Sequence, residues 1–168
     1  MPVICPATPA DIPTIRDLAH RTWPATFGDI LSPAQIDYML ERMYAPAALR
    51  EQMHDLGHAF LLALDNTGQP RAYVSYQFDY LPATTKVHKL YVLPQGQRAG
   101  FGRSLLEAVA KTAKQADQRR LRLDVNYQNP AVGFYERLGF RKVDEVTTDI
   151  GEGFLMEDYV YELDLPLV

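Results

Sequence analysis

The chain contains very little cysteine, since Cys5 is the only one in 168 residues. A single thiol cannot form a disulfide within the chain, and it excludes a zinc site built from four cysteines. Long apolar runs are missing as well, and none approaches the roughly 20 residues that a membrane-spanning helix requires. Residues 1–9 lack a basic region followed by an apolar segment, so no secretory signal is expected. These absences predict a soluble cytoplasmic protein.

Positive charge is also scarce. The chain has 17 Lys and Arg against 21 Asp and Glu, a formal net charge of −4. A nucleic-acid partner is not expected, because binding to DNA without sequence specificity needs a basic face that displaces counterions. The same charge balance leaves room for a cationic substrate. The 4 His residues are scattered and show no spacing typical of metal ligands, so no metal is predicted.

The sequence does contain a regular series of predicted helices and strands. Thr8-Pro9 and Ser32-Pro33 are typical helix starts, because Ser and Thr cap the first turn and Pro is favoured within it. Residues 65–68 are a predicted hairpin turn. The predicted strands are 3–7, 59–64, 71–79, 85–93, 121–125, 141–150 and 154–163; the predicted helices begin at 9, 33 and 46 and cover 100–116 and 131–138. This order predicts one mixed α/β (α+β) domain over residues 1–168, with about four to five helices on a mostly antiparallel sheet of about seven strands.

The turn after the fourth predicted strand is informative about chemistry. The strand ends at Leu93, and a helix begins near Gly100. Glycines let the backbone approach an anion closely, and the free N–H groups of a new helix attract negative charge. Arg98 and Arg103 add cationic side chains. The turn therefore suits a pyrophosphate, although a structural helix start explains Gly100-Phe101-Gly102 alone about equally well.

Two other nucleotide-binding motifs do not fit this turn. A Walker loop requires Gly-Lys-Ser/Thr, whereas Gly102 is followed by Arg103 and Ser104. A dinucleotide fingerprint requires a third glycine where Leu105 stands. Neither a P-loop nucleotide nor a dinucleotide is therefore the expected ligand.

Two segments together resemble the GCN5-related N-acetyltransferases, the GNAT superfamily, and in particular its small bacterial members. Residues 97–102 (Gln-Arg-Ala-Gly-Phe-Gly) fit the family signature Gln/Arg-x-x-Gly-x-Gly/Ala. Residues 129–140 (Asn-Pro-Ala-Val-Gly-Phe-Tyr-Glu-Arg-Leu-Gly-Phe) are similar to the second family block, and they follow at the family spacing. The predicted order of elements agrees with the family along essentially the whole chain.

The resemblance implies the GNAT fold, acetyl-CoA as the donor and an amine as the acceptor. In this family the loop amides hold the pyrophosphate of CoA, and the preceding strand pairs its backbone with the pantetheine arm. A backbone N–H near Val92 would then polarise the thioester carbonyl. The cofactor-binding residues implied in this part of the chain are Leu90, Tyr91, Val92, Gln97, Arg98, Ala99, Gly100, Phe101, Gly102 and Arg103.

Tyr135 matches the family tyrosine that lies near the CoA sulfur. Its hydroxyl would protonate the departing thiolate, and the alternative is an aromatic side chain packed on the sheet. The family asparagine corresponds to the position of Gln128, and Asn129 stands one position later. Asn129 therefore either contacts the pantetheine arm or simply caps the following helix.

No carboxylate lies on the predicted strand before the glycine turn, where family members often carry a catalytic Glu. His88 is the candidate general base instead, because its parity places it on the same face as Leu90 and Val92. The alternative is a partly buried histidine without a catalytic role.

Four residues are candidates for contact with the acceptor. Trp23 and Phe27 lie in a predicted loop over residues 23–30, where they either line a substrate pocket or plug the space between helices. Asp29 and Asp158 would pair with a second amine if the acceptor is a polyamine, as a looser likeness to spermidine/spermine acetyltransferases suggests.

Three functions remain open at this stage. The first is acetylation of a primary amine of a small molecule by direct attack in a ternary complex. The second is acetylation of a protein or peptide, and the third is a regulatory domain that binds acyl-CoA without catalysis. A homodimer is also left open, since no interface is identifiable in the sequence.

Overall fold

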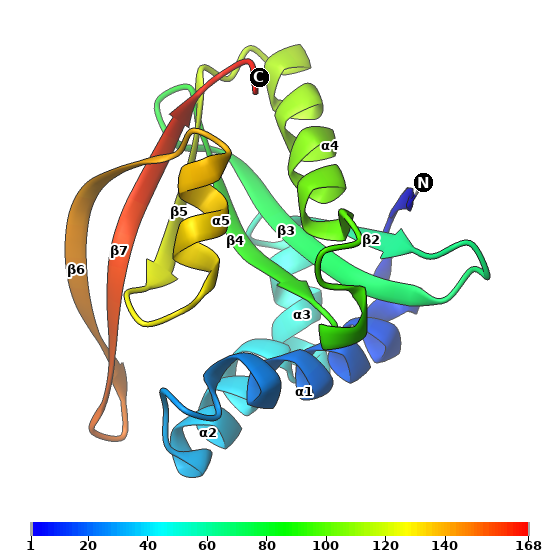
Figure 1. Ribbon diagram of the computed structural model, residues 1–168. Helices are drawn as coiled ribbons and strands as arrows, with labels where there is room; N and C mark the ends of the chain where they lie inside the picture. Colours follow the sequence, from blue (N-terminus) through cyan, green and yellow to red (C-terminus); the bar gives the residue numbers. More distant parts are fainter. Residues whose placement is uncertain (1, 168) are drawn as a thin grey trace. The chain divides into compact units, whose positions relative to one another are not determined.

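Helices and strands follow one another in the predicted order along residues 2–167, which the computed structural model describes (Figure 1). The chain divides into two units. The first contains the residues up to Gln77 together with His88–Val109, and the second contains Phe78–Val87 and the residues from Ala110 onward. Strand β3 (Pro70–Leu81), strand β4 (Thr84–Val92) and helix α4 (Phe101–Gln115) each belong partly to both units. The single domain over residues 1–168 stays a prediction.

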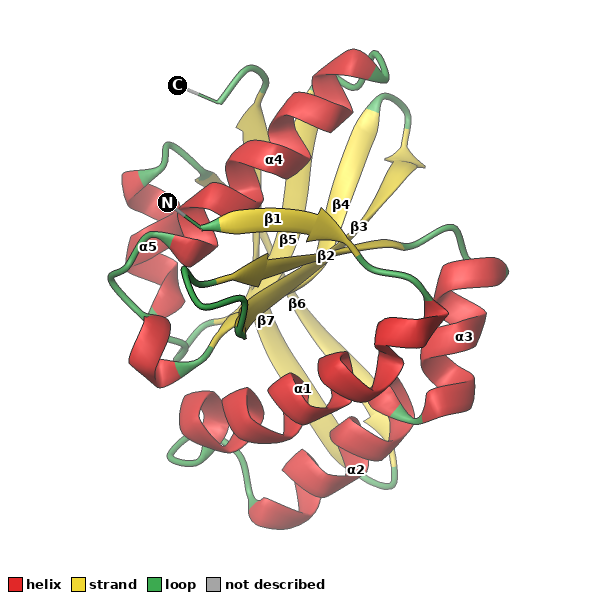
Figure 2. Ribbon diagram, turned by 90° about the vertical axis from the view of Figure 1, so that its right-hand side faces the viewer, coloured by secondary structure: helices red, strands yellow, loops and turns green. Residues whose placement is uncertain are grey.

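The first unit pairs an antiparallel sheet with helices from the N-terminal half of the chain. Its elements are β1 (Val3–Pro6), a 3-10 turn η1 (Pro9–Asp11), α1 (Ile12–Phe27), α2 (Pro33–Tyr44), α3 (Pro46–His54), β2 (Ala59–Leu64), the first part of β3, the end of β4, a 3-10 turn η2 (Pro94–Gly96) and the start of α4. Strand β2 pairs antiparallel with both β1 and β3. Helices α1, α2 and α3 follow one another and contact each other (Figure 2).

The helix starts in this unit arise from the expected local signals. The Thr8 side chain accepts a hydrogen bond from the backbone N–H of Ala10, and the Asp11 carboxylate accepts one from the N–H of Thr8. The Ser32 hydroxyl accepts from the N–H of Gln35 at 3.1 Å. These contacts satisfy donors that have no acceptor within the helix, which is why the helices begin there.

The predicted loop over residues 23–30 is wrong for residues 23–27, because helix α1 continues through Phe27; residues 28–30 form a turn. Pro24 lies inside the helix, where a proline lacks its N–H and costs about 3 kcal/mol. The turn nevertheless closes, and the N–H of Gly28 donates to the carbonyl of Pro24 at 2.9 Å. Trp23 and Phe27 are one helical turn apart and both buried, with ring centroids 4.6 Å apart. Burying each of these aromatics contributes roughly 2–3 kcal/mol, which offsets the cost of the proline.

The second unit contains the C-terminal strands. Its elements are the end of β3, the start of β4, the end of α4, β5 (Arg120–Asn126), α5 (Ala131–Arg137), β6 (Arg141–Gly151) and β7 (Phe154–Asp164). Residues 84–87 of β4 pair in parallel with residues 120–123 of β5. Strand β7 pairs antiparallel with β5 and with β6. The inward positions of β5, Leu121, Leu123 and Val125, are buried, while Arg122 and Asp124 alternate with them.

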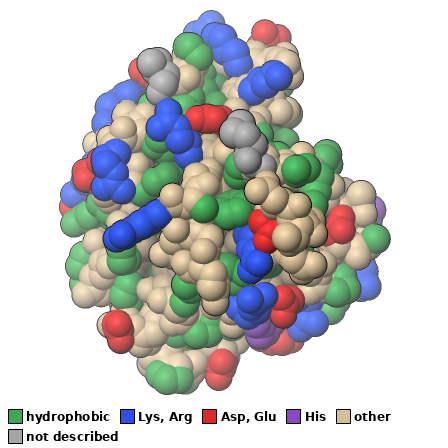
Figure 3. Space-filling view, turned by 45° about the vertical axis from the view of Figure 1, so that its right-hand side comes forward, with side chains coloured by type: hydrophobic (Ala, Val, Ile, Leu, Met, Phe, Trp, Pro, Cys, Tyr) green, Lys and Arg blue, Asp and Glu red, His purple; other side chains and the backbone are tan. Residues whose placement is uncertain are grey.

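The seven strands of the described chain form one sheet in the order β1-β2-β3-β4-β5-β7-β6. The β4–β5 pair is parallel, whereas the β1–β2, β2–β3, β5–β7 and β6–β7 pairs are antiparallel. Together with five α-helices this confirms the predicted mixed, mostly antiparallel α/β class. The face in Figure 3 shows Lys and Arg side chains with Asp and Glu between them. Within residues 2–167, every helix is too short or too polar to cross a membrane.

Candidate functional site

The loop after β4 presents backbone N–H groups at the start of α4. Arg98 and Gly100 both have positive φ, at 70° and 83°, and α4 begins directly afterwards at Phe101. The first N–H bonded back to the loop is that of Ser104, which donates to the carbonyl of Gly100 at 2.9 Å. The N–H groups of Phe101, Gly102 and Arg103 precede it and have no acceptor within the helix. This geometry suits an anion, as the sequence predicts.

Two glycines of this loop differ in what a side chain at their position would meet. A Cβ on Gly100 would meet no atom within 4 Å, so space for a side chain is not the reason for a glycine here. The reason is the left-handed backbone conformation, which glycine adopts without strain. A Cβ on Gly96 would lie 3.1 Å from the ring of Phe101, so a side chain at this position would crowd that ring. Gly96 is not among the residues predicted from the sequence. A glycine at the end of a turn between a strand and a helix was the only signal for it.

The two predicted arginines of the loop differ in their surroundings. The guanidinium of Arg103 donates from Nε to the Glu107 carboxylate at 2.8 Å, and both side chains are exposed. Among the described residues Arg98 makes no hydrogen bond or ion pair, and it is exposed. Gln97 donates from its side chain to the carbonyl of Val92 at 3.5 Å. Arg98 is therefore the better placed of the two cations to neutralise a ligand.

Strand β4 has two different faces. His88 and Leu90 are half-buried, whereas Lys89 between them is buried, with 6% of its surface exposed. Tyr91 follows the parity of Lys89, and its ring lies 5.5 Å from that of Trp23 and 5.8 Å from that of Tyr73. The predicted role of Tyr91 in cofactor binding stays a prediction.

Trp23 and Phe27 pack as core side chains. They are 1% and 2% exposed, and the indole N–H of Trp23 donates to the hydroxyl of Tyr44 at 3.3 Å. That hydroxyl lies 2.7 Å from the hydroxyl of Tyr73, and burial raises the pKa of both tyrosines. Their burial therefore favours the interpretation that Trp23 and Phe27 plug the space between helices over the interpretation that they line a substrate pocket.

Asp29 belongs to the turn that follows α1, where its side chain is exposed. The chain turns there because the N–H of Ile30 donates to the carbonyl of Phe27 at 2.9 Å. The predicted contact of Asp29 with the acceptor stays a prediction.

His88 is held by two neighbours. Its Nε2 lies 2.9 Å from Oε1 of Gln77, and its ring stacks on that of His58 with centroids 4.0 Å apart. Because an amide oxygen only accepts hydrogen bonds, Nε2 carries the proton in this arrangement and does not act as a base. The structure thus gives His88 a positioned, stacked ring but does not favour catalysis through Nε2.

Lys89 is a buried cation that the sequence analysis did not recognise. Its ammonium donates to Oε1 of Gln52 at 2.7 Å and lies over the rings of Tyr44 and Phe60, at 5.5 Å and 5.7 Å from their centroids. No acidic side chain forms an ion pair with it among the described residues. Desolvation lowers the pKa of Lys89 to about 8. No signal in the sequence distinguished it from the neighbouring Lys86.

In the second unit, Tyr135 lies in α5 and is 6% exposed. Its ring contacts those of Phe134 and Phe140, with centroids 5.3 Å and 5.6 Å away. Burial raises the pKa of Tyr135 well above its ordinary value, so the hydroxyl keeps its proton at neutral pH. A protonated hydroxyl is what a general acid requires.

Asn129 organises the start of α5. Its side-chain oxygen accepts from the N–H of Ala131 at 2.9 Å, as Asn126 does from the N–H of Gln128. The contact supports the capping role that the sequence analysis held open for Asn129. Binding of the pantetheine arm by Asn129 stays a prediction.

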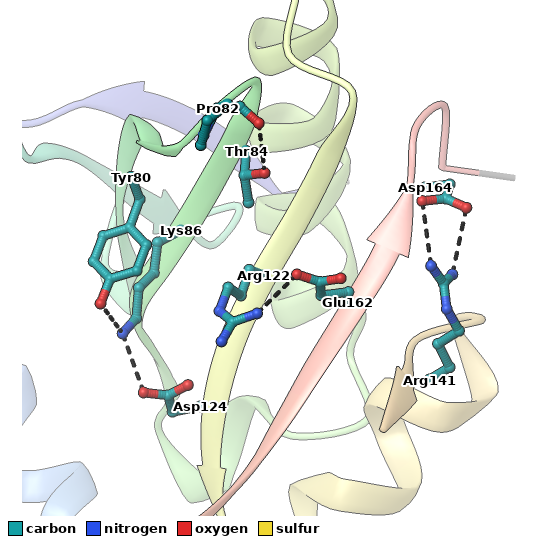
Figure 4. A network of polar contacts seen from close by, with 9 residues as sticks. All are labelled: Tyr80, Pro82, Thr84, Lys86, Arg122, Asp124, Arg141, Glu162 and Asp164. Carbon is teal, nitrogen blue, oxygen red and sulfur yellow. Dashed lines mark hydrogen bonds and ion pairs between the residues drawn. The ribbon is translucent and has the colours of Figure 1, made fainter. Parts of the chain in front are cut away.

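Asp158 is half-buried on β7. Charged residues of β4, β5 and β7 in the same unit form the polar network shown in Figure 4. Lys86 donates to the Asp124 carboxylate at 3.1 Å, and its ammonium lies 4.4 Å from the ring centroid of Tyr80. Burial raises the pKa of Asp158 to about 6; the negative charge of Asp124 adds to this, and the positive charge of Lys86 opposes it. Lys86 and Asp124 are functional candidates that the sequence analysis missed. The alternation along β5 was a signal for Asp124, since it stands between the buried Leu123 and Val125.

The described residues do not bring three His, Cys, Asp or Glu side chains together in a way that could hold a metal ion. The absence of a metal stays a prediction.

Comparisons with known proteins agree with this architecture. The family model described as an acetyltransferase (GNAT) domain matches residues 29–163. A search of curated proteins gave no significant match.

Several solved structures are similar to the chain. The PaiA N-acetyltransferase of Thermoplasma acidophilum, in complex with coenzyme A, is 22% identical with a TM-score of 0.82, over 98% of this chain and 99% of that one. The ribosomal-protein-S18-alanine N-acetyltransferase of Escherichia coli is 19% identical with a TM-score of 0.73, over 100% and 96%. A mutant of the spermidine N-acetyltransferase SpeG of Vibrio cholerae is 16% identical with a TM-score of 0.70, over 97% and 93%. At these identities the likeness shows the fold.

Proposed function

Because the chain belongs to the GNAT acetyltransferase family, we propose that it transfers the acetyl group of acetyl-CoA to a primary amine of a small molecule. The observation that best supports binding of the donor, acetyl-CoA, is the geometry of the loop between β4 and α4. Gly100 adopts a left-handed backbone there, directly before three N–H groups that have no acceptor within the helix. The similar PaiA structure is a complex with coenzyme A, which fits the same assignment.

The loop would hold the pyrophosphate of CoA through its backbone. Three N–H groups at a helix start attract two phosphate groups through both hydrogen bonds and the helix dipole. The guanidinium of Arg98 would add a charge-assisted hydrogen bond, whereas Arg103 is already engaged by Glu107. Leu90 and Val92 would lie along the pantetheine arm, as the family resemblance implies.

Tyr135 would act as the general acid. The carbon–sulfur bond of the thioester breaks and leaves a thiolate, whose ordinary pKa is about 8.5. The buried hydroxyl of Tyr135 is protonated at neutral pH and can supply the proton. This role rests on the family block over residues 129–140 and on the protonation state of the hydroxyl.

The acceptor would be cationic before it reacts. The net charge of −4 disfavours an acidic acceptor, and the half-buried carboxylate of Asp158 offers a counterion for an ammonium group. The similar SpeG protein is a spermidine N-acetyltransferase, which supports including polyamines among the candidates. Asp29 would serve as a second anionic contact for a long diamine.

The test is release of CoA thiol when the protein is mixed with acetyl-CoA and a panel of monoamines, diamines, spermidine and short peptides. We expect turnover with at least one small primary amine and little with peptides. A preference for diamines over monoamines of equal length would support the role of Asp29 and Asp158.

The variant that tests the CoA site is Gly100→Val, and its matched control is Gly57→Val. A β-branched residue is strongly disfavoured at the φ of 83° found for Gly100, so the loop must change its backbone and CoA affinity should fall at least tenfold. Gly57→Val, at a positive φ of 72° with nothing within 4 Å, carries the same backbone penalty in a different loop. CoA bound equally well by wild type and Gly100→Val would contradict the pyrophosphate assignment, and turnover on peptides alone would contradict the small-molecule acceptor.

A further inference from the structure

Lys89 is a buried cation whose hydrogen bonds are incomplete. An ammonium group has three N–H donors, and among the described residues one acceptor meets them, Oε1 of Gln52 at 2.7 Å. The rings of Tyr44 and Phe60, 5.5 Å and 5.7 Å from the ammonium, stabilise it through their faces but do not cancel its charge. Desolvation lowers the pKa of Lys89 to about 8, so the group is still charged at neutral pH. Buried charges are normally paired with an opposite charge, which predicts a counterion at this position.

Ser75 of β3 is a second buried donor in the first unit. It is 0% exposed, and its Oγ has no hydrogen-bond partner within the described part of the chain. A buried hydroxyl without a partner loses the hydrogen bonds that it makes with water in the unfolded chain. Such groups are rare in folded proteins, so Ser75 marks a place where a further hydrogen-bonding group is expected.

The pairing of β3 with β4 brings Ser75 next to Lys89. These neighbouring strands follow one another after a short turn, so they run antiparallel. The rings of Tyr73 and Tyr91 contact each other across the two strands, with centroids 5.8 Å apart. Two positions further along each strand, on the same face, stand Ser75 and Lys89. Side chains opposite each other on one face have Cβ atoms roughly 4.5–5.5 Å apart.

The pairing of β2 with β3 leads to the same place. Phe60 is opposite Ser75 across these strands, and the ring of Phe60 lies 5.7 Å from the ammonium of Lys89. Ser75 therefore stands between Phe60 on one neighbouring strand and Lys89 on the other, and the lysine side chain extends across it towards Phe60. All of these residues, together with Gln52 and Tyr44, belong to the first unit.

The chemistry of the two unsatisfied groups is that of donors. The ammonium of Lys89 can only donate, and the hydroxyl of Ser75 has a proton to give. An anion would accept both hydrogen bonds and would neutralise the ammonium. A water molecule would leave the charge uncompensated, and it would need acceptors for its own two protons. A polyatomic oxyanion such as phosphate has more acceptor oxygens than these two side chains can satisfy, so the donor set suits a monatomic ion.

We propose that Lys89 and Ser75 bind a halide ion of the size of chloride, on the face of β3 and β4 that carries the rings of Tyr44 and Phe60. The ion would accept one hydrogen bond from the ammonium and one from the hydroxyl, and the two opposite charges would form a neutral pair in the interior of the first unit. This site is independent of the proposed function, because it does not use the loop between β4 and α4.

The first test is thermal unfolding of wild type at neutral pH in sodium chloride, sodium bromide and sodium gluconate of equal ionic strength. Gluconate is too large for a site made by two side chains, so it controls for screening by salt. An ion that binds only the folded chain stabilises it by mass action. Each tenfold rise in chloride above its Kd should therefore raise Tm by roughly 3–5 °C relative to gluconate.

Two variants locate the effect, and each protein is compared with itself in two salts, so a change in basal stability does not matter. Lys89→Met removes the charge and should abolish the difference between chloride and gluconate. Ser75→Ala removes one donor, so it should reduce this difference while Tm in gluconate stays equal or rises. Lys111→Met, at an exposed position of α4, is the matched control and should respond to chloride as wild type does.

The second test is diffraction from wild-type crystals soaked in sodium bromide. We expect an anomalous peak within hydrogen-bonding reach of Nζ of Lys89 and Oγ of Ser75. Equal Tm values in chloride and gluconate, or a water molecule at that position, would overturn the proposal. A bromide peak without a chloride effect on Tm would show binding at crystal concentration only and would also overturn it. A chloride effect that persists in Lys89→Met would place the ion elsewhere.

Discussion

Lys89 provides the sharpest stability prediction, because its ammonium is buried without a carboxylate partner. It is 6% exposed and donates to Gln52 at 2.7 Å, above the rings of Tyr44 and Phe60. Desolvation lowers its pKa to about 8 in the folded chain, against roughly 10.4 in an unfolded one. Replacement by Met keeps an unbranched side chain and removes the charge.

The direction in which the free energy of unfolding changes with pH follows from the number of protons that the folded and unfolded states bind. Between about pH 8 and pH 10 the unfolded chain keeps the Lys89 proton while the folded chain loses it, so this group makes the free energy of unfolding rise with pH. The rise from pH 7 to pH 9 is roughly 1.3 kcal/mol for a folded pKa near 8. Burial raises the pKa of Tyr44 and Tyr73, which lowers stability above about pH 10, so the comparison ends at pH 9.

The assay is urea unfolding of wild type and Lys89→Met at pH 7, 8 and 9. The free energy of unfolding of wild type should gain roughly 1.3 kcal/mol on that of the variant across this range, and groups present in both proteins, such as the thiol of Cys5, cancel in the difference. The absolute difference at pH 7 is not diagnostic, since losing the charge is favourable and leaving Gln52 without its donor costs about 1–3 kcal/mol. Lys111→Met, at an exposed position of α4, controls for the loss of a lysine. Parallel curves for wild type and Lys89→Met would refute a desolvated ammonium.

Three further predictions concern the donor side. Gly96→Ala places a methyl group 3.1 Å from the ring of Phe101; we expect a loss of about 1–3 kcal/mol in the free energy of unfolding, measured by urea titration, together with weaker CoA binding. Tyr135→Phe should lower kcat by at least tenfold with an unchanged Kd for CoA, and equal kcat values would remove Tyr135 from the mechanism. Arg98→Ala should weaken CoA binding by roughly three- to tenfold in calorimetry and Arg103→Ala by less, because Arg103 is engaged by Glu107; the reverse order would show that the pairing gives way to the ligand.

The elements that sequence patterns identify well are those with local causes. The N-caps Thr8 and Ser32 and the hairpin turn at residues 65–68 involve atoms a few positions apart, and the structure confirms all three. The turn before α4 belongs to the same class, because the positive φ of Gly100 is a local requirement that glycine meets.

The end of α1 was mispredicted because the contacts that stabilise the helix there come from residues far away in the sequence. Pro24 and the small residues around it favour a loop, whereas the burial of Trp23 and Phe27 stabilises the helix. Their partners, including Tyr44 and Tyr91, come from other elements. Sequence periodicity contains no information on which distant side chains will cover a helix.

The charged residues of the candidate site could not be predicted from the sequence for a similar reason. Lys86 and Lys89 stand three positions apart on one strand, and nothing local distinguishes the half-buried one from the buried one. Lys86, Asp124 and Asp158 belong to the paired strands β4, β5 and β7. The ion pair between Lys86 and Asp124 joins residues 38 positions apart in the sequence.

The central claim is the transfer of an acetyl group from CoA to a small amine by a protein that holds CoA at the turn before α4. It is tested most directly by mass spectrometry of the amine panel after incubation with carbon-13 acetyl-CoA, using wild type and Gly100→Val. The account predicts a labelled acetyl group on the nitrogen of at least one small primary amine with wild type, and much less with the variant. A label found only on peptides, or on no amine at all despite tight binding of CoA, would contradict it.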